Sequence, residues 1–151
     1  MHNQLLCVGH KPPKWVLEGE SQYLKRLRPT LKVTLISPSS KSNSDQRKAQ
    51  EAELIQAKLV KNAWVVALDE TGSQYSSREL SDKVTAWQRH GRPLAFVIGG
   101  ADGLDKSFLA QADSALSLSR QTLPHALVRV FLAEALYRVQ ALQAGHPYHR
   151  D

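Results

Sequence analysis

The residues best suited to chemistry begin with a glycine cluster in the last third of the chain. Gly99, Gly100 and Gly103 directly follow an apolar run, in the order Gly-Gly-x-x-Gly. Glycine lets the backbone reach positive φ and lets a flat or charged ligand lie against bare amides. The spacing differs from the dinucleotide-binding pattern Gly-x-Gly-x-x-Gly. Taken alone, the cluster therefore favours a tight strand-to-helix turn over a ligand cradle.

A second candidate is the segment Leu-Ser-Arg-Gln-Thr-Leu at 118–123, which directly precedes Pro124. It is polar in the middle and apolar at both ends. Its backbone amides and carbonyls could hold an adenine or a similar base. The alternative is a simple connecting loop.

Cations and aromatic side chains gather toward the C-terminal end. They are Arg120, His125, Arg129, Arg138, Tyr148, His149 and Arg150. Such cations suit contacts to phosphate, and an aromatic ring suits stacking against a base. Any one arginine is more simply a solvated surface charge, so the cluster is more informative than its members.

Other kinds of site find little support. His146 and His149 flank Pro147 and have no carboxylate or thiolate nearby, so the six histidines predict no metal site. Cys7 lies in an apolar run and is more typical of core packing than of a nucleophile. The chain contains neither a Gly-x-Ser-x-Gly elbow nor a phosphate loop, which argues against hydrolases and nucleoside triphosphatases.

Asp69 raises one competing hypothesis, because an aspartate after a buried parallel strand is typical of phospho-accepting receiver domains. Those domains also need an acidic pair after the first strand to hold a divalent ion. This chain has Gly9-His10-Lys11 at that place. The receiver hypothesis fails on this point.

Composition sets limits on the class of protein. The 151 residues fit one domain, and a hydrophobic content of 42% suffices for one packed core. A formal charge of +6 fits a polyanionic partner such as RNA, or an ordinary basic protein. The single cysteine excludes an internal disulfide and suits a reducing compartment. With no signal-peptide pattern and no long apolar run, we expect a cytoplasmic protein that does not cross a membrane.

The candidate residues need a scaffold, and hydrophobic periodicity predicts alternating strands and helices. Apolar runs predict five strands, at 5–8, 33–36, 63–68, 94–98 and 115–118. Segments of helical period predict helices at about 13–29, 45–61, 76–91, 105–111 and from Pro124 onward. Ser76 and Glu79 are spaced for a capping box, and Glu134 and Arg138 for an ion pair.

This alternation is typical of one α/β domain over residues 1–151, with a mostly parallel sheet of five or six strands and helices on both faces. Ligands of such sheets bind beyond the carboxyl ends of the strands. The loops after Leu68, Ile98 and Leu118 lie there. We therefore expect a site at these three loops.

Several motifs, in order and at matching spacing, extend over nearly the whole length. They are Val8-Gly9 with Trp15, Leu68-Asp69, Val97-Ile-Gly-Gly100 with Gly103-Leu104, Thr122-Leu-Pro-His125 with Leu127-Val-Arg129, Glu134-Ala-Leu-Tyr-Arg138, and His146-Pro-Tyr-His-Arg150. With them, the chain resembles the RlmH-type ribosomal RNA large-subunit methyltransferases of the SPOUT class. Ala101-Asp102 and Arg120-Gln121 depart from or vary within that pattern, so the side-chain roles of Arg120 and Gln121 stay open.

The resemblance implies an α/β-knot fold whose C-terminal part forms a deep trefoil knot, which general folding rules do not predict. It also implies a homodimer and S-adenosyl-L-methionine as cofactor, bound in the knotted loops. The implied cofactor contacts are Leu68, Gly99, Gly100, Leu118, Ser119, Arg120, Gln121, Thr122 and Leu123. The implied reaction methylates N-3 of a pseudouridine, conventionally numbered 1915, in the helix 69 loop of 23S rRNA in the assembled 70S ribosome.

RNA contacts are expected from His125, Arg129, Arg138, Tyr148 and Arg150. The acceptor is an imide nitrogen whose proton must leave, so a general base is plausible, and His149 is the candidate. The alternative for His149 is an RNA contact without a catalytic role. The alternative for the whole chain is a non-catalytic ribosome-associated RNA-binding protein, which has no need of a cofactor cradle.

Overall fold

One parallel sheet organises residues 2–148, the part of the chain that the structure, a computed structural model, describes. Its strands are β1 (Asn3–Val8), β2 (Leu31–Ile36), β3 (Trp64–Ser73), β4 (Leu94–Ile98) and β5 (Ser114–Leu116). They lie in the order β2-β1-β4-β3-β5, and each neighbouring pair is parallel. The expected parallel α/β architecture is confirmed.

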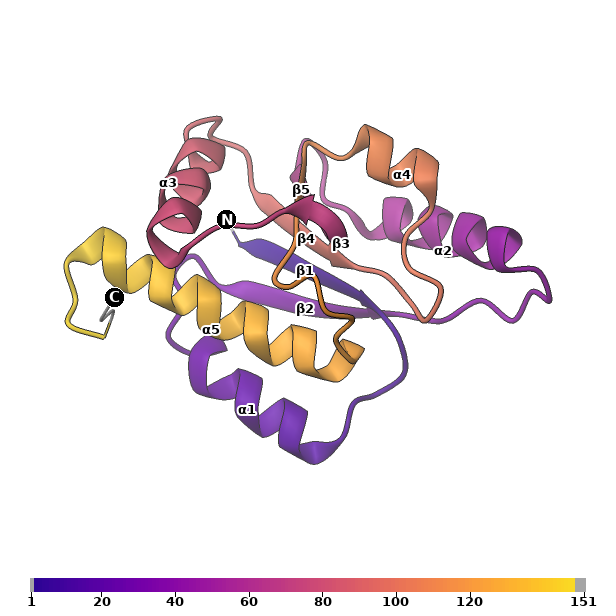
Figure 1. Cartoon of the computed structure of the whole chain (residues 1–151), viewed down its shortest axis with the longest axis horizontal. Helices are drawn as coiled ribbons and strands as arrows, with labels where there is room; N and C mark the ends of the chain where they lie inside the picture. The colour runs from indigo at the N-terminus through magenta and orange to yellow at the C-terminus, as the bar shows by residue number, and fades with distance from the viewer. Residues whose placement is uncertain (1, 149–151) are drawn as a thin grey trace.

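Helices cover both faces of this sheet. They are α1 (Lys14–Leu24), α2 (Ser44–Lys58), α3 (Ser77–Gln88), α4 (Lys106–Gln111) and α5 (His125–Ala144). Helices α1, α3 and α5 lie on one face, while α2 and α4 lie on the other (Figure 1). Because this cover removes both faces from water, β4 is buried at every position and its sequence is apolar throughout.

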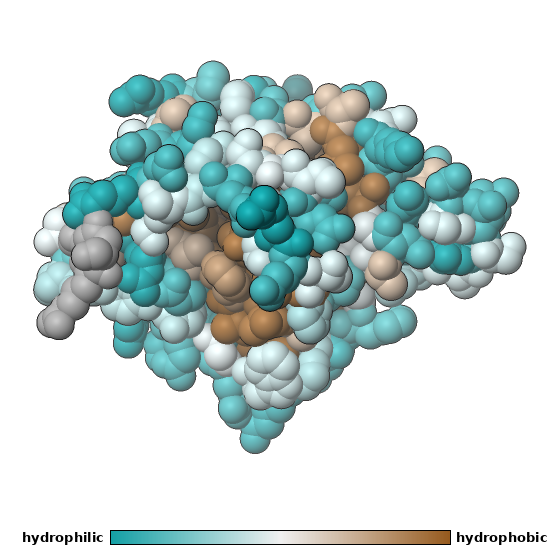
Figure 2. All heavy atoms as spheres, viewed as in Figure 1, coloured by the Kyte–Doolittle hydropathy of each residue, from teal (hydrophilic) through white to brown (hydrophobic). Residues whose placement is uncertain are grey.

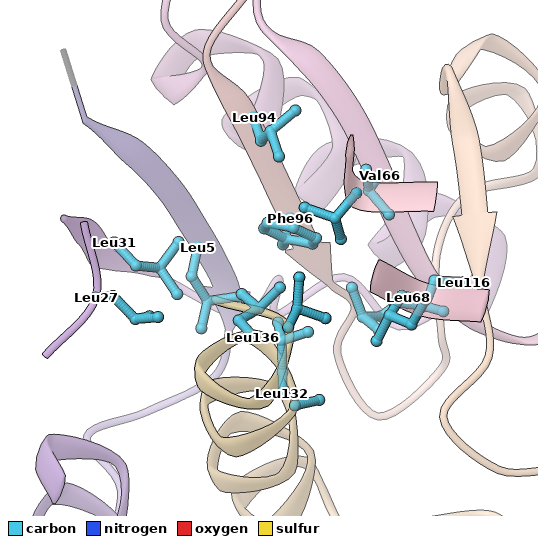
Figure 3. Close-up of a cluster of buried hydrophobic side chains, with 14 of the residues drawn as sticks. Leu5, Leu27, Leu31, Val66, Leu68, Leu94, Phe96, Leu116, Leu132 and Leu136 are labelled. Atoms are coloured by element: carbon cyan, nitrogen blue, oxygen red, sulfur yellow. The ribbon is translucent and has the colours of Figure 1, made fainter. Parts of the chain in front are cut away.

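The two faces carry two hydrophobic cores. In the larger core, Leu132 and Leu136 of α5 point toward the sheet, where Phe96 of β4 meets them (Figure 3). Leu5 and Leu6 are consecutive in β1 and both fully buried, yet Leu5 packs in this core and Leu6 in the opposite one. The strand period of two explains how neighbouring residues serve both cores.

Strand β3 continues to Ser73, whereas the apolar pattern predicts an end at Leu68. Leu116 of β5 pairs with both Leu68 and Ser73, so the register shifts between them. A Cβ at Gly72 would lie 2.7 Å from the carbonyl carbon of Ala115, which shows how closely the extension lies on β5. The extension is polar and pairs across an irregularity, so apolar alternation could not reveal it.

Helix α1 is shorter than the predicted helix, which extended to Pro29, and it ends at Leu24. Beyond it, the backbone N–H of Arg28 donates to the Gln140 side chain at 2.8 Å, and Gln140 donates to the carbonyl of Arg26 at 2.9 Å. The N–H groups of Arg26 and Leu27 still make local turn bonds, and from Arg28 onward the backbone is tied to α5 instead.

Several local predictions are confirmed. Ser76 and Glu79 form a capping box at α3, and Arg138 pairs with Glu134 at 2.7 Å. Cys7 lies in the core, where burial raises the pKa of its thiol to about 12, so it is suited to packing rather than nucleophilic attack. Among residues 2–148, no helix combines the length and apolar character needed to span a bilayer.

Candidate functional site

A cavity of about 330 Å³ lies at the carboxyl ends of β4 and β5 and beside Leu68, Asp69 and Glu70 of β3. It is lined by Leu68, Asp69, Glu70, residues 98–104, Leu116, Leu118, Ser119, residues 121–123, His125 and Val128. Its volume falls within the range of small-molecule sites, roughly 300–1,000 Å³. The expected site at the end of the sheet therefore corresponds to a real concavity.

Strand register brings the three predicted loops together. Leu68 of β3 pairs with Ile98 on one side and with Leu116 on the other. Strands β4 and β5 therefore end level with Leu68, and the polar extension of β3 meets the segments that follow β4 and β5 around one space. Of the nine residues predicted to bind the cofactor, eight line this cavity; Arg120 is exposed and does not.

The glycine bend after β4 is built by close backbone packing. Gly103 has a φ of +84°, and its N–H donates to the carbonyl of Gly100 at 3.0 Å. A Cβ at Gly99 would lie 2.7 Å from the carbonyl carbon of Gly103. The bend is thus the tight turn that its spacing favours, and it also forms a side-chain-free wall of the cavity.

The segment at 118–123 is ordered by its own side chains. Ser117 Oγ donates to the carbonyl of Ser119 at 2.9 Å, and the N–H of Gln121 donates to Ser119 Oγ at 2.9 Å. Thr122 Oγ1 donates to Glu70 Oε2 at 3.1 Å, which joins this segment to the extension of β3. These hydrogen bonds make the 118–123 segment a defined wall of the cavity rather than a loose connecting loop.

Three acidic residues of the cavity, Asp69, Glu70 and Asp102, are absent from the predicted site. Asp69 and Glu70 are neighbours in β3, and both line the space. The backbone N–H and hydroxyl of Thr71 both donate to Asp69. The position of Asp69 and Glu70 directly after the buried apolar run of β3 was the available signal, because side chains there face the ligand end of a parallel sheet.

His125, expected to contact RNA, is the first residue of α5 and lies on the cavity lining. It therefore stands beside the predicted cofactor residues rather than with the C-terminal cations. Its place follows from Pro124, which begins the helix directly after the 118–123 segment.

The structure contradicts the prediction that Arg129 contacts phosphate. Arg129 is only 5% exposed and forms two hydrogen bonds with Glu20 of α1, from Nη2 to Oε1 at 2.6 Å and from Nε to Oε2 at 3.0 Å. The Glu20 carboxylate occupies the Nη2 and Nε donors of Arg129, and the guanidinium is buried away from water. This buried bidentate pair joins α1 to α5.

Arg138 and Tyr148 lie together away from this cavity. Tyr148 folds back on α5, where its hydroxyl donates to Glu134 at 2.8 Å and its ring meets the edge of Tyr137 at 4.8 Å between centroids. The Arg138 guanidinium lies 4.9 Å from the Tyr148 ring centroid. Burial, followed by the bond to Glu134, raises the pKa of the Tyr148 hydroxyl.

Two predicted residues lie outside the described part of the chain. His149, the candidate base, and Arg150, a candidate RNA contact, both follow Tyr148.

Arg138 itself lines a second cavity of about 190 Å³, which shares Leu116 and Leu118 with the larger one. Within residues 2–148, no three His, Cys, Asp or Glu side chains gather in a way that could hold a metal ion.

Comparison with protein families shows to which family the chain belongs. A family model described as "Predicted SPOUT methyltransferase" matches residues 1–149. The chain belongs to the SPOUT methyltransferase family. SPOUT methyltransferases take the transferred methyl group from S-adenosylmethionine, so the expected cofactor is confirmed with the family.

Relatives within this family are similar along almost their entire length. The chain is 45% identical to the ribosomal RNA large subunit methyltransferase H of Paraburkholderia phymatum, with 99% of both proteins covered. It is 46% identical to the protein of the same description from Burkholderia ambifaria, with 97% of both covered.

Solved structures support the same fold. A probable methylase family protein from Haemophilus influenzae matches 99% of this chain and 71% of its own, with a TM-score of 0.58 and 15% identity. A putative methylase family protein from Neisseria gonorrhoeae matches 99% of this chain and 87% of its own, with a TM-score of 0.55 and 12% identity. At these identities, the likeness is one of fold.

Proposed function

We propose that this SPOUT methyltransferase methylates 23S rRNA, at N-3 of a pseudouridine in the helix 69 loop, within the assembled 70S ribosome. The observation that carries the proposal is the meeting of the β3 extension with the loops after β4 and β5 around one cavity of about 330 Å³. The names of relatives at 45% and 46% identity, ribosomal RNA large subunit methyltransferase H, support the RNA substrate.

The cavity suits S-adenosylmethionine by its chemistry. Gly99 and Gly100 offer backbone without side chains, while Leu68 and Leu118 offer apolar surface to a flat base. Glu70 supplies a carboxylate for hydroxyl or ammonium groups. The residues that would hold the cofactor are Leu68, Gly99, Gly100, Leu118, Ser119, Gln121, Thr122 and Leu123, with Arg120 left out because it lies off the lining.

Positioning supplies most of the catalysis in this proposal. When bound, S-adenosylmethionine supplies a methyl group on a positively charged sulfur, which leaves with the electron pair of the broken carbon–sulfur bond. The fixed loops hold the reacting groups in line, which converts an encounter into an oriented contact. The proton of the imide nitrogen passes to a base, and His149 is our candidate. RNA contacts are proposed for His125, Arg138, Tyr148 and Arg150.

A homodimer is part of the proposal, supported by exposed apolar residues on two adjoining helices. Figure 2 shows an apolar patch over α5, bordered by hydrophilic residues. Phe131 and Leu127 of α5 are 42% and 39% exposed, and Trp15 of the neighbouring α1 is 55% exposed. Patches of this kind are typical of subunit contacts.

The remaining features of the proposal concern the whole chain. We propose that residues 1–151 form one SPOUT domain with a C-terminal trefoil knot. The single sheet with a core on each face supports one domain. Location in the cytoplasm, with the ribosome as partner, follows from the proposed substrate.

The direct test combines binding with transfer. Purified full-length chain is expected to bind S-adenosylmethionine by calorimetry and to transfer its labelled methyl group to 70S ribosomes that lack the modification. Mass spectrometry of 23S rRNA fragments then locates the product. Failure to bind either the cofactor or its demethylated product would favour the non-catalytic RNA-binding alternative.

A further inference from the structure

Helix α2 reaches the glycine bend and its tip with two side chains, Arg47 and Glu51. Arg47 and Glu51 are four residues apart in this helix and so share one of its faces. Neither residue lines the cavity. Both nevertheless reach the segment 99–104, which we name the cofactor loop.

Arg47 holds the tip of the cofactor loop. Its Nε donates to Asp102 Oδ2 at 2.7 Å, and its Nη2 donates to Oδ1 at 3.2 Å. Its Nη1 also donates to the carbonyls of Lys41 and Ser42, at 3.0 and 2.9 Å. The hydrogen bond from Arg47 lowers the pKa of the Asp102 carboxyl group. One guanidinium thus joins the cofactor loop to the start of α2.

Glu51 meets the same loop closer to β4. It is only 5% exposed, and its Oε2 accepts the N–H of Ser39 at 2.9 Å. Its Oε1 has no hydrogen-bond partner among the described residues. A Cβ at Gly100 would lie 3.1 Å from that oxygen, so the carboxylate rests against the backbone of the bend.

A buried acceptor without a partner is rare and unfavourable, so its presence calls for a physical reason. The geometry offers one reason: the Glu51 carboxylate supports the backbone of the bend at Gly100. Val8 lies on the same side, 3.0 Å from where a Cβ of Gly100 would stand. Glu51 and Val8 together pack tightly against the backbone of the bend at Gly100.

We propose that Arg47 and Glu51 are positioning residues, which hold the cofactor loop in its cavity-lining conformation and thereby set the affinity for S-adenosylmethionine. This inference rests on the proposed cofactor site. The physical basis is preorganisation: a loop already held in its bound form loses less conformational freedom when the ligand binds.

The first test is a double-mutant cycle on the ion pair, with calorimetric Kd for S-adenosylmethionine as the readout. Arg47→Ala and Asp102→Ala are each expected to weaken binding about threefold to fivefold, the range open to a partly exposed ion pair whose side chains are 28% and 25% exposed. The double variant is expected to bind no more weakly than either single one, because each removes the same contact.

The chain contains a closely matched control for Arg47. Arg92 pairs with Asp113 at 3.8 Å and donates to the carbonyls of Asn62 and Ala63, and the side chains of both ion pairs are exposed to similar extents. It lies at the opposite end of the sheet. Arg92→Ala is expected to leave the Kd unchanged; equal weakening by both variants would overturn the proposal.

The second test separates support from general stability at Glu51. Glu51→Gln keeps the side-chain volume and an acceptor for Ser39, so its Kd is expected to stay within about twofold of wild type. Glu51→Ala removes the support and is expected to weaken binding about fivefold or more. Thermal unfolding is measured on the same samples.

The outcomes distinguish this inference from the proposed function. If the wild-type chain does not bind S-adenosylmethionine, the proposed function fails. If wild type binds and Glu51→Ala unfolds at lower temperature but keeps its Kd, Glu51 is merely structural and the positioning role is wrong. Should Glu51→Ala not fold, the Arg47 cycle decides the matter alone.

Discussion

The cofactor cavity and the C-terminal part of α5 are built in opposite ways. The wall of the cavity at Gly99 and Gly100 is made by backbone, in a bend that has no room for side chains. The region from Glu134 to Tyr148 is made by side chains that bind one another. A backbone site keeps its shape with or without a partner, whereas paired side chains must exchange partners before they contact RNA. The two regions therefore call for different tests.

The largest expected effect concerns the buried pair of Arg129 and Glu20. Arg129 lies in α5 between His125, which lines the cavity, and Glu134. Replacement of Arg129 by Ala leaves Glu20 charged and buried, which is expected to lower the free energy of unfolding by about 3–5 kcal/mol. Urea denaturation measures this loss, and Glu20→Ala serves as the reciprocal variant. If Arg129→Ala kept full stability but flattened the salt dependence of ribosome binding, Arg129 would return to the RNA side.

The backbone character of the cavity is tested at Gly99. A Cβ there would lie 2.7 Å from the backbone of Gly103, so Gly99→Ala must displace the bend. Overpacking of this kind costs about 1–3 kcal/mol, and we expect at least about a tenfold loss of cofactor affinity. Gly9→Ala is the control, because a Cβ at Gly9 meets nothing within 4 Å. Equal affinities for the two variants would contradict a backbone-built site.

The smallest effect concerns the paired side chains near the C-terminus. The pKa of Tyr148 is raised above its usual value of 10.0, chiefly by burial and then by the bond to Glu134. A raised pKa in the folded state gives stability that is present below pH 10 and is lost as the pH rises toward the folded-state pKa. Wild type should therefore lose stability above pH 10 more steeply than Tyr148→Phe. Thermal unfolding between about pH 9 and 12 checks this. Parallel curves of stability against pH for wild type and Tyr148→Phe would show that the Tyr148 hydroxyl does not contribute.

The same contrast explains how much the sequence could predict. Buried parallel strands carry continuous apolar runs, so the sheet and the turn beyond Ile98 can be predicted from the sequence. The bend was readable because Gly99 and Gly100 follow a strand directly. These signals depend on residues close together in the chain, so they can be recognised in a single sequence.

Side-chain pairing was not readable, because partners lie far apart in the chain. Arg129 and Glu20 are separated by 109 positions, and Arg47 and Asp102 by 55. An arginine on a helix has the same sequence signature whether it faces solvent or a buried carboxylate. The polar extension of β3 was missed for a related reason, since its pairing depends on β5 and not on its own alternation.

Hydrogen exchange of the backbone amides, with and without S-adenosylmethionine, tests the central claim most directly. The account predicts added protection at residues 99–104 and 117–123, together with unchanged exchange at residues 134–148. Protection confined to the C-terminal region, or no change at the strand-end loops despite measured binding, would contradict it.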